Sequence, residues 1–297
     1  MLTSIPLIKN KISKNIIGND DNIKISLAAV MSGGHILIED LPGTGKTTFA
    51  KCITAALNLD FKRIQFTSDL LPSDILGFNF LLNDKFEIKK GPIFTNIVLA
   101  DELNRASPKT QSAFLEAMEE KSVTIDRETL KLPDPFIVIA TQNPSDLSGT
   151  SLLPESQLDR FMISFSLENL TTDQQLNLLK NENLFEIKRN TDFNIKNFMS
   201  QKIININDNV YQYIQGVKQY ILTNFPEIHI SSRCLKQIVA ISKSLAIING
   251  NNYVTIQEIK DVLPYVLKHR INIIEKKHVN SFIKEEILKQ ITVPDDK

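Results

Sequence analysis

The feature that most constrains this chain is a glycine-rich loop between a strand pattern and a helix pattern. Residues 40–48 (DLPGTGKTT) follow a short apolar run at 35–39 and precede residues 47–57, whose apolar side chains recur at helical spacing. Gly43 and Gly45 let the backbone curl so that successive N–H groups face one anion, and the helix N-terminus adds the positive end of its dipole. Strand, loop and helix in this order predict a phosphate-binding loop.

The residue types within the loop suit a nucleoside triphosphate. Lys46 is placed to reach the β- and γ-phosphates, and the Thr47 hydroxyl to ligate Mg²⁺. Asp40 stands where the G-x-x-x-x-G-K-[ST] pattern has its first glycine. A helix N-terminus with coincidental glycines is the alternative, but strand, loop, Lys-Thr pair and helix together favour phosphate binding. The predicted nucleotide-binding residues here are Asp40, Leu41, Pro42, Gly43, Thr44, Gly45, Lys46, Thr47 and Thr48.

A second apolar run, residues 96–101, ends in two acids, Asp101 and Glu102. A strand of this kind places both acids at its carboxyl end, beside the loops of a parallel sheet. Taken alone, the pair is typical of a solvated strand end. After a phosphate-binding loop, it predicts that Asp101 holds Mg²⁺, directly or through water, and that Glu102 positions or deprotonates the attacking water.

A third run, residues 136–141, is followed by Gln142 and Asn143. It predicts another buried strand that ends at the same edge of the sheet. Asn143 would then hydrogen-bond both the γ-phosphate and the water. The alternative is an ordinary Asn-Pro turn after a strand.

The spacing of these patterns predicts the fold class. Strand patterns at 61–66 and 161–167 and a helix pattern at 108–119 alternate with the segments above, which favours an α/β fold with a doubly wound parallel sheet. After residue 167 helical patterns dominate, at 173–179, 210–222, 232–248 and 256–271. Thr255 and Glu258 form a capping-box pattern before the last of these. We expect a nucleotide-binding domain at 1–170 and a helical lid domain at 171–297.

Composition excludes several classes of protein. The 297 residues carry 34 basic and 34 acidic side chains, so the zero net charge gives no general attraction to nucleic acid or anionic membrane. Cys52 and Cys234 lack metal-ligand spacing and predict reduced thiols, and the four histidines lack zinc-site spacing. The chain has no apolar run near the roughly 18 residues of a membrane span. Residues 1–18 lack the apolar core of a signal peptide, so we expect a cytoplasmic protein without stable membrane insertion.

Further motifs resemble the MoxR family of AAA+ ATPases. They are the loop at 34–47, GPIF at 91–94, ADELNRA at 100–106, PKTQ at 108–111, LEAM at 115–118, ATQNP at 140–144 and LPESQLDRF at 153–161. The resemblance runs in order from about Ile16 to Arg270. It implies a P-loop AAA+ fold with a C-terminal all-helical lid.

The resemblance also implies roles for two arginines. Arg160 matches the arginine finger, which reaches the γ-phosphate in the neighbouring subunit; the alternative is a surface arginine paired with Asp159. Arg233 matches the sensor II arginine at the start of a lid helix, which would close the nucleotide site over Lys46. Its alternative is a helix-start residue behind a Ser231 cap, and the family commonly has Pro where this chain has Ser232.

Four other segments take weaker roles from the resemblance. Ile16, Ile17 and Gly18 match the segment that packs on adenine, the alternative being a turn between two helices. Residues 77–90 match the helix-2 insert, a hairpin that faces the pore of a ring, the alternative being aromatics that pack on their own domain. Arg105 matches a residue that couples to the neighbouring subunit. Residues 268–270 (KHR) match a lid signature whose role stays open.

Together these features predict an ATPase that uses Mg²⁺ and works as a homo-oligomeric ring, expected to be a hexamer. The family implies chaperone-like remodelling or maturation of partner proteins, including assistance in metal-cofactor insertion and partners with von Willebrand factor A domains. Two other interpretations are an ATP-dependent regulatory or scaffold module and a nucleic-acid-directed motor. Glu102 and Arg160 argue against a pure binding module, and the zero net charge argues against a nucleic-acid motor.

Overall fold

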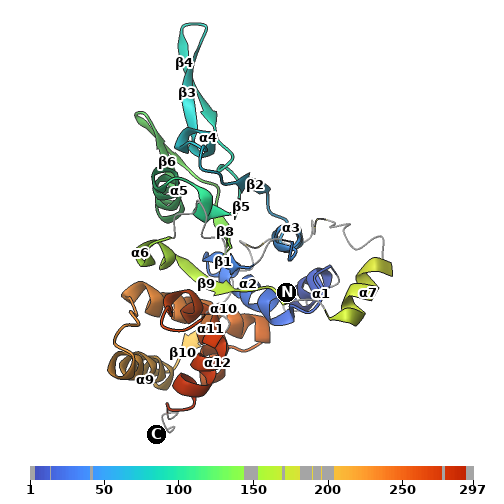
Figure 1. Cartoon of the computed structure of the whole chain (residues 1–297), viewed down its shortest axis with the longest axis vertical. Coiled ribbons are helices and arrows are strands. Elements are labelled where there is room, and N and C mark those ends of the chain that lie inside the picture. Colours follow the sequence, from blue (N-terminus) through green and yellow to red (C-terminus); the bar gives the residue numbers. More distant parts are fainter. Residues whose placement is uncertain are drawn as a thin grey trace.

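The computed structural model describes residues 4–13, 15–40, 43–143, 153–168, 171–180, 189, 195, 204–275 and 278–291. Its centre is a five-stranded parallel sheet with the strand order β2-β5-β8-β1-β9 (Figure 1). The strands are β1 (His35–Glu39), β2 (Phe61–Gln65), β5 (Ile97–Asp101), β8 (Ile137–Gln142) and β9 (Phe161–Phe165). In this order β1 lies between β8 and β9, so the direction of the strand order reverses beside β1, which confirms the prediction of a doubly wound α/β sheet.

Alternate side chains of the central strands enter two separate cores. In β1, Ile36 and Ile38 join one core while Leu37 joins the other, because successive side chains of a strand point to opposite faces. The first core also holds side chains of the helices α1 (Ser4–Ser13), α2 (Asp20–Met31) and α3 (Lys46–Ala56). The second holds side chains of α4 (Pro72–Leu76) and α5 (Pro108–Glu120). Helices therefore cover both faces of the sheet.

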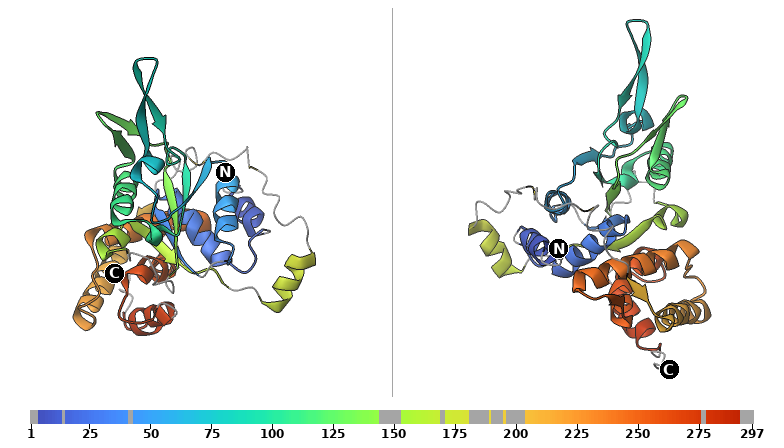
Figure 2. Two further views of the ribbon diagram at one scale, coloured as in Figure 1. Left: turned by 45° about the horizontal axis from the view of Figure 1, so that its top comes forward. Right: turned by 180° about the vertical axis from the view of Figure 1, so that it is seen from behind.

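Two hairpins project from the same end of the molecule (Figures 1 and 2). The first pairs β3 (Gly77–Leu82) with β4 (Lys85–Lys90), at the position predicted for the helix-2 insert. The second pairs β6 (Ser122–Ile125) with β7 (Glu128–Lys131) and was not predicted. The side chain of Asn79 in β3 donates a hydrogen bond to Asp126, which lies in the turn between β6 and β7, so the turn of the second hairpin is joined to the first.

The first hairpin exposes large apolar side chains. Phe86 is 79% exposed, Leu81 60% and Phe78 42%. These three side chains therefore do not pack into their own domain, which contradicts the alternative interpretation for them. The hairpin presents an apolar surface to its surroundings.

The C-terminal part is helical, as predicted. Its elements are α7 (Thr172–Lys180), α9 (Asp208–Asn224), α10 (Ser232–Asn249), α11 (Ile256–Leu267), the 3₁₀ turn η2 (Lys268–Arg270), α12 (Val279–Phe282) and the π-helical turn η4 (Ile283–Leu288). A two-stranded parallel pair, β10 (Asn205–Ile206) with β11 (Tyr253–Val254), is an addition that the sequence did not predict. Lid side chains share the first core with the sheet, and Ser32 at the end of α2 donates to Ala240 O of α10 at 3.1 Å. Lid and sheet are thus packed on each other.

Local sequence signals fixed several helix ends. The capping box of Thr255 and Glu258 is present at the start of α11, with Glu258 Oε2 accepting from Thr255 N at 2.9 Å.

Cys52 and Cys234 are both buried and not in a disulfide. None of the helices in the described part of the chain combines the length and apolar character needed to cross a bilayer.

Candidate nucleotide site

The glycine-rich loop has the backbone shape of an anion cradle. Gly43 and Gly45 have φ of 86° and 90°, a region that favours glycine, and a Cβ built on either would meet no atom within 4 Å. Gly45 is the N-cap residue of α3, and it supplies no side chain to the first N–H groups of the helix. These N–H groups and the helix dipole therefore suit a negatively charged ligand. Leu41 and Pro42 lie outside the described residues.

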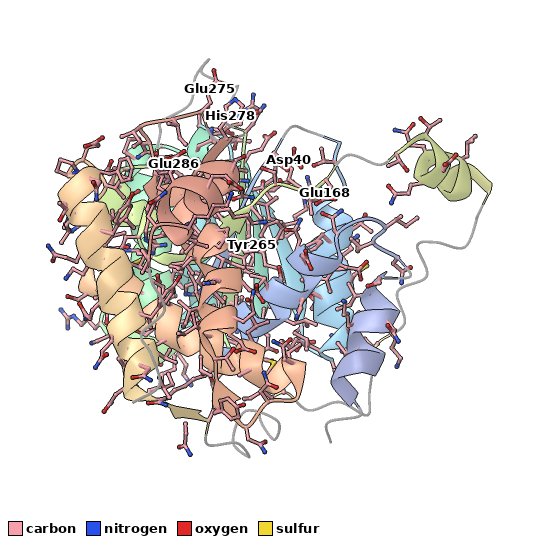
Figure 3. The ribbon with its side chains drawn as sticks, turned by 90° about the horizontal axis from the view of Figure 1, so that it is seen from below. Asp40, Glu168, Tyr265, Glu275, His278 and Glu286 are labelled. Carbon is pink, nitrogen blue, oxygen red and sulfur yellow. The ribbon has the colours of Figure 1, made fainter. Side chains whose placement is uncertain are left out.

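Asp40 has a structural role that explains its departure from glycine. Its carboxylate Oδ2 accepts a hydrogen bond from Leu167 N at 3.2 Å, and its carbonyl oxygen accepts one from Lys46 Nζ at 2.9 Å. Figure 3 shows Asp40 and Glu168 at the same edge of the molecule. Asp40 therefore ties the loop to the chain that follows β9. Lys46, Thr47 and Thr48 are half-buried in the first turn of α3, and Thr44 is half-buried in the loop.

The acids of β5 meet the polar end of β8 at this same edge. Thr141 Oγ1 donates to Asp101 Oδ1 at 2.6 Å and accepts from Glu102 N at 2.9 Å. Asn143 follows the end of β8, and β8 pairs in parallel with β1, which leads into the loop. The three sequence signals therefore meet at the carboxyl ends of three neighbouring strands, where α/β sheets bind ligands.

Glu102 is held in an unusual conformation. Its φ of 57° is left-handed, which costs a non-glycine residue roughly 1–2 kcal/mol, and such strain clusters at functional sites. Its carboxylate Oε2 accepts from Gln65 Nε2 at 2.9 Å and from Arg105 Nη1 at 3.2 Å. Two donors from separate elements thus orient this acid.

The carboxylate of Asp101 also forms an ion pair with the guanidinium of Arg63 in β2. Arg63 Nη2 and Nε donate to Asp101 Oδ2 at 2.6 and 3.0 Å, and Nη2 also donates to Gln65 Oε1 at 2.6 Å. The carboxylate of Asp101 and the hydroxyl of Thr47 are hard oxygen donors that fit Mg²⁺. Within the described residues no cluster of three or more His, Cys, Asp or Glu side chains is placed to hold a metal ion.

Arg160 lies at the other end of the sheet from the loop. It immediately precedes β9, which pairs in parallel with β1, whereas the loop follows the carboxyl end of β1. At about 3.3 Å per residue, the two ends of a five-residue strand are roughly 16 Å apart. Arg160 Nε lies 2.9 Å from Glu119 Oε2, so its partner is Glu119, and Asp159 pairs with Arg270 at 3.0 Å instead.

Arg233 lies beside Arg160. It occupies the first turn of α10, behind Ser231, whose Oγ accepts from Cys234 N at 3.0 Å and caps the helix. Its guanidinium binds Oε1 of the same Glu119 carboxylate. This differs from our expectation that Arg233 closes over Lys46. The reason is that Ser231 Oγ donates to Asp159 Oδ2 at 2.8 Å, which holds the start of α10 at the Arg160 end of β9.

The segment expected to contact adenine connects α1 with α2. Gly18 has φ of 76°, and a Cβ there would lie 3.1 Å from the side-chain amide of Gln174. Asn19 Oδ1 accepts from Glu168 N at 3.0 Å, next to Leu167, which contacts Asp40. Ile16, Ile17 and Gly18 thus form a turn between helices, and this turn lies beside the chain that contacts the loop.

The lid adds one aromatic side chain to this region, Tyr265 of α11. Its ring lies 6.4 Å from that of Phe165, and Figure 3 shows it in the same part of the molecule as Glu168. Burial, together with the negative charges of Asp21, Glu168 and Asp261, raises the pKa of Tyr265 well above its usual value. The side chain is therefore a neutral phenol near the end of β9.

Sequence reasoning missed Arg63, Gln65 and Glu119. Arg63 and Gln65 lie in a predicted strand, Arg63 in its middle and Gln65 at the carboxyl end of β2, where it pairs with Asp101; only the place of Gln65 gave a signal that it reaches the acids of the next strand. Glu119 ends a predicted helix, and only the tertiary fold brings it to two arginines far away in sequence.

Two family models match parts of this chain. The model of the ATPase family associated with various cellular activities (AAA) matches residues 35–163, and that of the AAA lid domain matches 225–291. The chain is 38% identical to the uncharacterized protein YeaC of Bacillus subtilis over 94% of this chain and 90% of that protein. It is 32% identical to Chaperone MoxR1 of Mycobacterium tuberculosis, over 88% and 74% of the two chains. A crystal structure of a candidate ATPase from Cytophaga hutchinsonii superposes with a TM-score of 0.85 at 33% identity, covering 99% of this chain and 96% of the other.

Proposed function

Because this chain belongs to the MoxR family of AAA+ ATPases, we propose that it hydrolyses ATP at the interfaces between the subunits of a homo-oligomeric ring. The turnover remodels or matures partner proteins. The observation that carries the proposal is the separation between Arg160 and the phosphate-binding loop of its own chain. The two lie at opposite ends of the paired strands β1 and β9. A complete site then needs a second subunit.

Nucleotide binding rests on the loop and the first turn of α3. The N–H groups around Gly43 and Gly45 face the phosphates, and Lys46 exchanges its contact with Asp40 O for the β- and γ-phosphate oxygens. Thr47 and Asp101 would hold Mg²⁺, which neutralises phosphate charge when bound. Ile16, Ile17 and Gly18 pack against adenine.

Hydrolysis rests on the acid after β5. Glu102 accepts a proton from the attacking water, and Asn143 orients that water against the γ-phosphate. Gln65 and Arg105 hold the carboxylate of Glu102, so these two side chains set the position of the base before the attacking water binds.

Charge stabilisation comes from the neighbouring subunit. Arg160 and Arg233 share Glu119, so both guanidiniums lie on one surface of the chain, away from its own loop. When that surface docks on the next subunit, both cations face its γ-phosphate and stabilise the transition state.

The exposed hairpin is the candidate surface for clients. Phe78, Leu81 and Phe86 expose apolar side chains that suit unfolded or loosely folded segments of a partner protein, and Phe80 is half-buried with its ring against that of Phe78. The name of the relative Chaperone MoxR1 supports a role on proteins. We propose a cytoplasmic protein whose partners include proteins with von Willebrand factor A domains.

Concentration dependence of turnover tests the proposal. Steady-state ATP hydrolysis with Mg²⁺ is measured per chain over a dilution series, while light scattering reports the oligomer. Activity per chain should fall as the ring dissociates, because monomers lack Arg160 from a neighbour. Constant activity per chain in samples that are fully monomeric would contradict the proposal. Glu102→Gln serves as the control for contaminating ATPases.

A further inference from the structure

Three consecutive residues of the lid turn η2 bury their basic side chains. Lys268 and His269 are buried, and the side chain of Arg270 is 4% exposed. Burial of a charged group is costly unless it is paired and hydrogen-bonded, so such a cluster demands specific partners. The nucleotide-site roles above use none of these three residues.

Arg270 binds the chain on both sides of Arg160. Its Nε donates to Asp159 Oδ1 at 3.0 Å, and its Nη2 donates to Asp159 O at 3.2 Å and to Phe161 O at 3.1 Å. His269 Nε2 donates to the same Phe161 carbonyl at 3.1 Å. The residues directly before and after Arg160 are therefore fixed by one lid turn.

Asp159 extends this arrangement to the second arginine. Its Oδ1 accepts from Arg270, while its Oδ2 accepts from Ser231 Oγ at 2.8 Å, and Ser231 caps the helix that carries Arg233. Arg270 also donates to Gln237 Oε1 on this helix at 2.6 Å. One buried guanidinium thus sets the backbone positions of Arg160 and Arg233 relative to each other.

Lys268 contacts the opposite end of the same strand. Its Nζ donates to Ser166 Oγ at 2.9 Å, and this hydroxyl donates to Glu39 O at 2.8 Å. Glu39 immediately precedes Asp40 and the phosphate-binding loop. The turn η2 therefore contacts the Arg160 end of β9 through Arg270 and the loop end through Lys268.

We propose that Arg270 is a positioning residue for the arginine finger: it fixes the backbone around Arg160, and through Asp159 and Ser231 that of Arg233, so that both reach the neighbouring nucleotide together. This inference rests on the proposed function, because it assumes that Arg160 acts on the next subunit. Its physical basis is preorganisation, since a misplacement of about 1 Å can cost on the order of 100-fold in rate.

The test mixes two chains that restore ATP hydrolysis together, and it places Arg270→Lys in either the one or the other. The acceptor chain carries Arg160→Ala and keeps its nucleotide site, and the donor chain carries Lys46→Ala and keeps Arg160. Arg270→Lys in the donor should lower kcat of the mixture by about tenfold or more, with KM for ATP unchanged. The same substitution in the acceptor should leave kcat of the mixture unchanged. A purely structural role would lower activity from either chain.

Lys268→Met is the matched variant from the same turn. Because Lys268 supports the loop side, its substitution should raise KM for ATP when placed in the acceptor and have no effect in the donor. Equal losses from both placements, for either variant, would overturn the proposal, as would full activity with Arg270→Lys in the donor.

A second variant covers the case in which Arg270→Lys does not fold. Asp159→Asn keeps the side-chain shape and one acceptor, and it should show the same donor-only loss of kcat. Thermal melting of each chain establishes folding before mixing. If the acceptor and donor without further substitutions fail to complement, the proposed trans site has failed. If they complement and neither variant shows placement dependence, only the positioning role has failed.

Discussion

Arg160 Nε lies 2.9 Å from Glu119 Oε2, at the end of β9 opposite to the phosphate-binding loop. Arg233 binds the other oxygen of this carboxylate, so one acid gathers two cations far from the loop of their own chain. At that position the two guanidiniums do not reach a nucleotide bound to the loop of their own chain. They can contact a γ-phosphate when this surface docks on the loop of another subunit.

Lys46→Ala should abolish nucleotide binding and leave the fold intact. Lys46 contacts only the carbonyl of Asp40 among the hydrogen bonds described for it, and its half-buried side chain is not part of either core. Titration with a fluorescent ATP analogue measures affinity, and thermal melting measures stability. Unchanged affinity would mean that the loop does not hold phosphates.

Glu102→Gln should separate binding from hydrolysis. The amide keeps the shape of the side chain and a partner for Arg105 or Gln65, but it is a poor proton acceptor. ATP should bind with near-normal affinity, and turnover should fall by about 100-fold or more. Single-turnover hydrolysis checks this, and an unchanged rate would remove Glu102 from the mechanism.

Arg233→Ala should be rescued by a partner chain. Because Arg233 shares Glu119 with Arg160, we expect it to act on the neighbouring subunit, and a mixture with Lys46→Ala should regain turnover. If Arg233 instead served its own nucleotide, no mixture with Lys46→Ala would contain a complete site. Turnover that stays absent, in rings shown to contain both chains, would show that Arg233 serves the nucleotide of its own chain.

The stability of the fold should depend on pH through His35. Burial, and then the charge of Lys121, lowers its pKa from 6.5 to about 3, and its Nδ1 accepts a hydrogen bond from Val138 N at 3.0 Å. Below about pH 6.5 the unfolded chain binds a proton that the folded chain does not, so the free energy of unfolding falls as pH falls toward 3. Between about pH 7 and pH 5 this group alone removes roughly 2 kcal/mol.

Urea unfolding of the parent and of His35→Gln over this range measures the effect. The variant should lose less stability on acidification, whatever its stability at neutral pH. Equal pH dependence in the two proteins would show that His35 does not carry the difference.

The sequence predicted the parts of this molecule in which local chemistry decides the structure. The run 35–39, the glycines before Lys46 and the capping box at Thr255 each have a local reason to adopt the observed form, and all of them do. The fold class followed from strand and helix periods in the same way. These features need no knowledge of distant contacts.

The parts that were missed depend on tertiary contacts. The strands β6 and β7 are four residues long and β10 and β11 two, too short for apolar alternation to identify them from the sequence, so packing defines them. The position of Arg233 follows from a hydrogen bond between Ser231 and Asp159, which are distant in sequence. Gln65 and Glu119 likewise gain their partners only when strands and helices assemble.

The most direct test of the trans site mixes two chains that are each inactive. Arg160→Ala keeps a nucleotide site without a finger for its neighbour, and Lys46→Ala keeps the finger without a nucleotide site. Each alone should hydrolyse ATP at least about 1,000-fold more slowly than the parent. In mixed rings, an intact loop faces an intact Arg160, so turnover should reappear and peak at an intermediate ratio. Rings shown to contain both chains, yet inactive at every ratio, would contradict the account, as would full activity of Arg160→Ala alone.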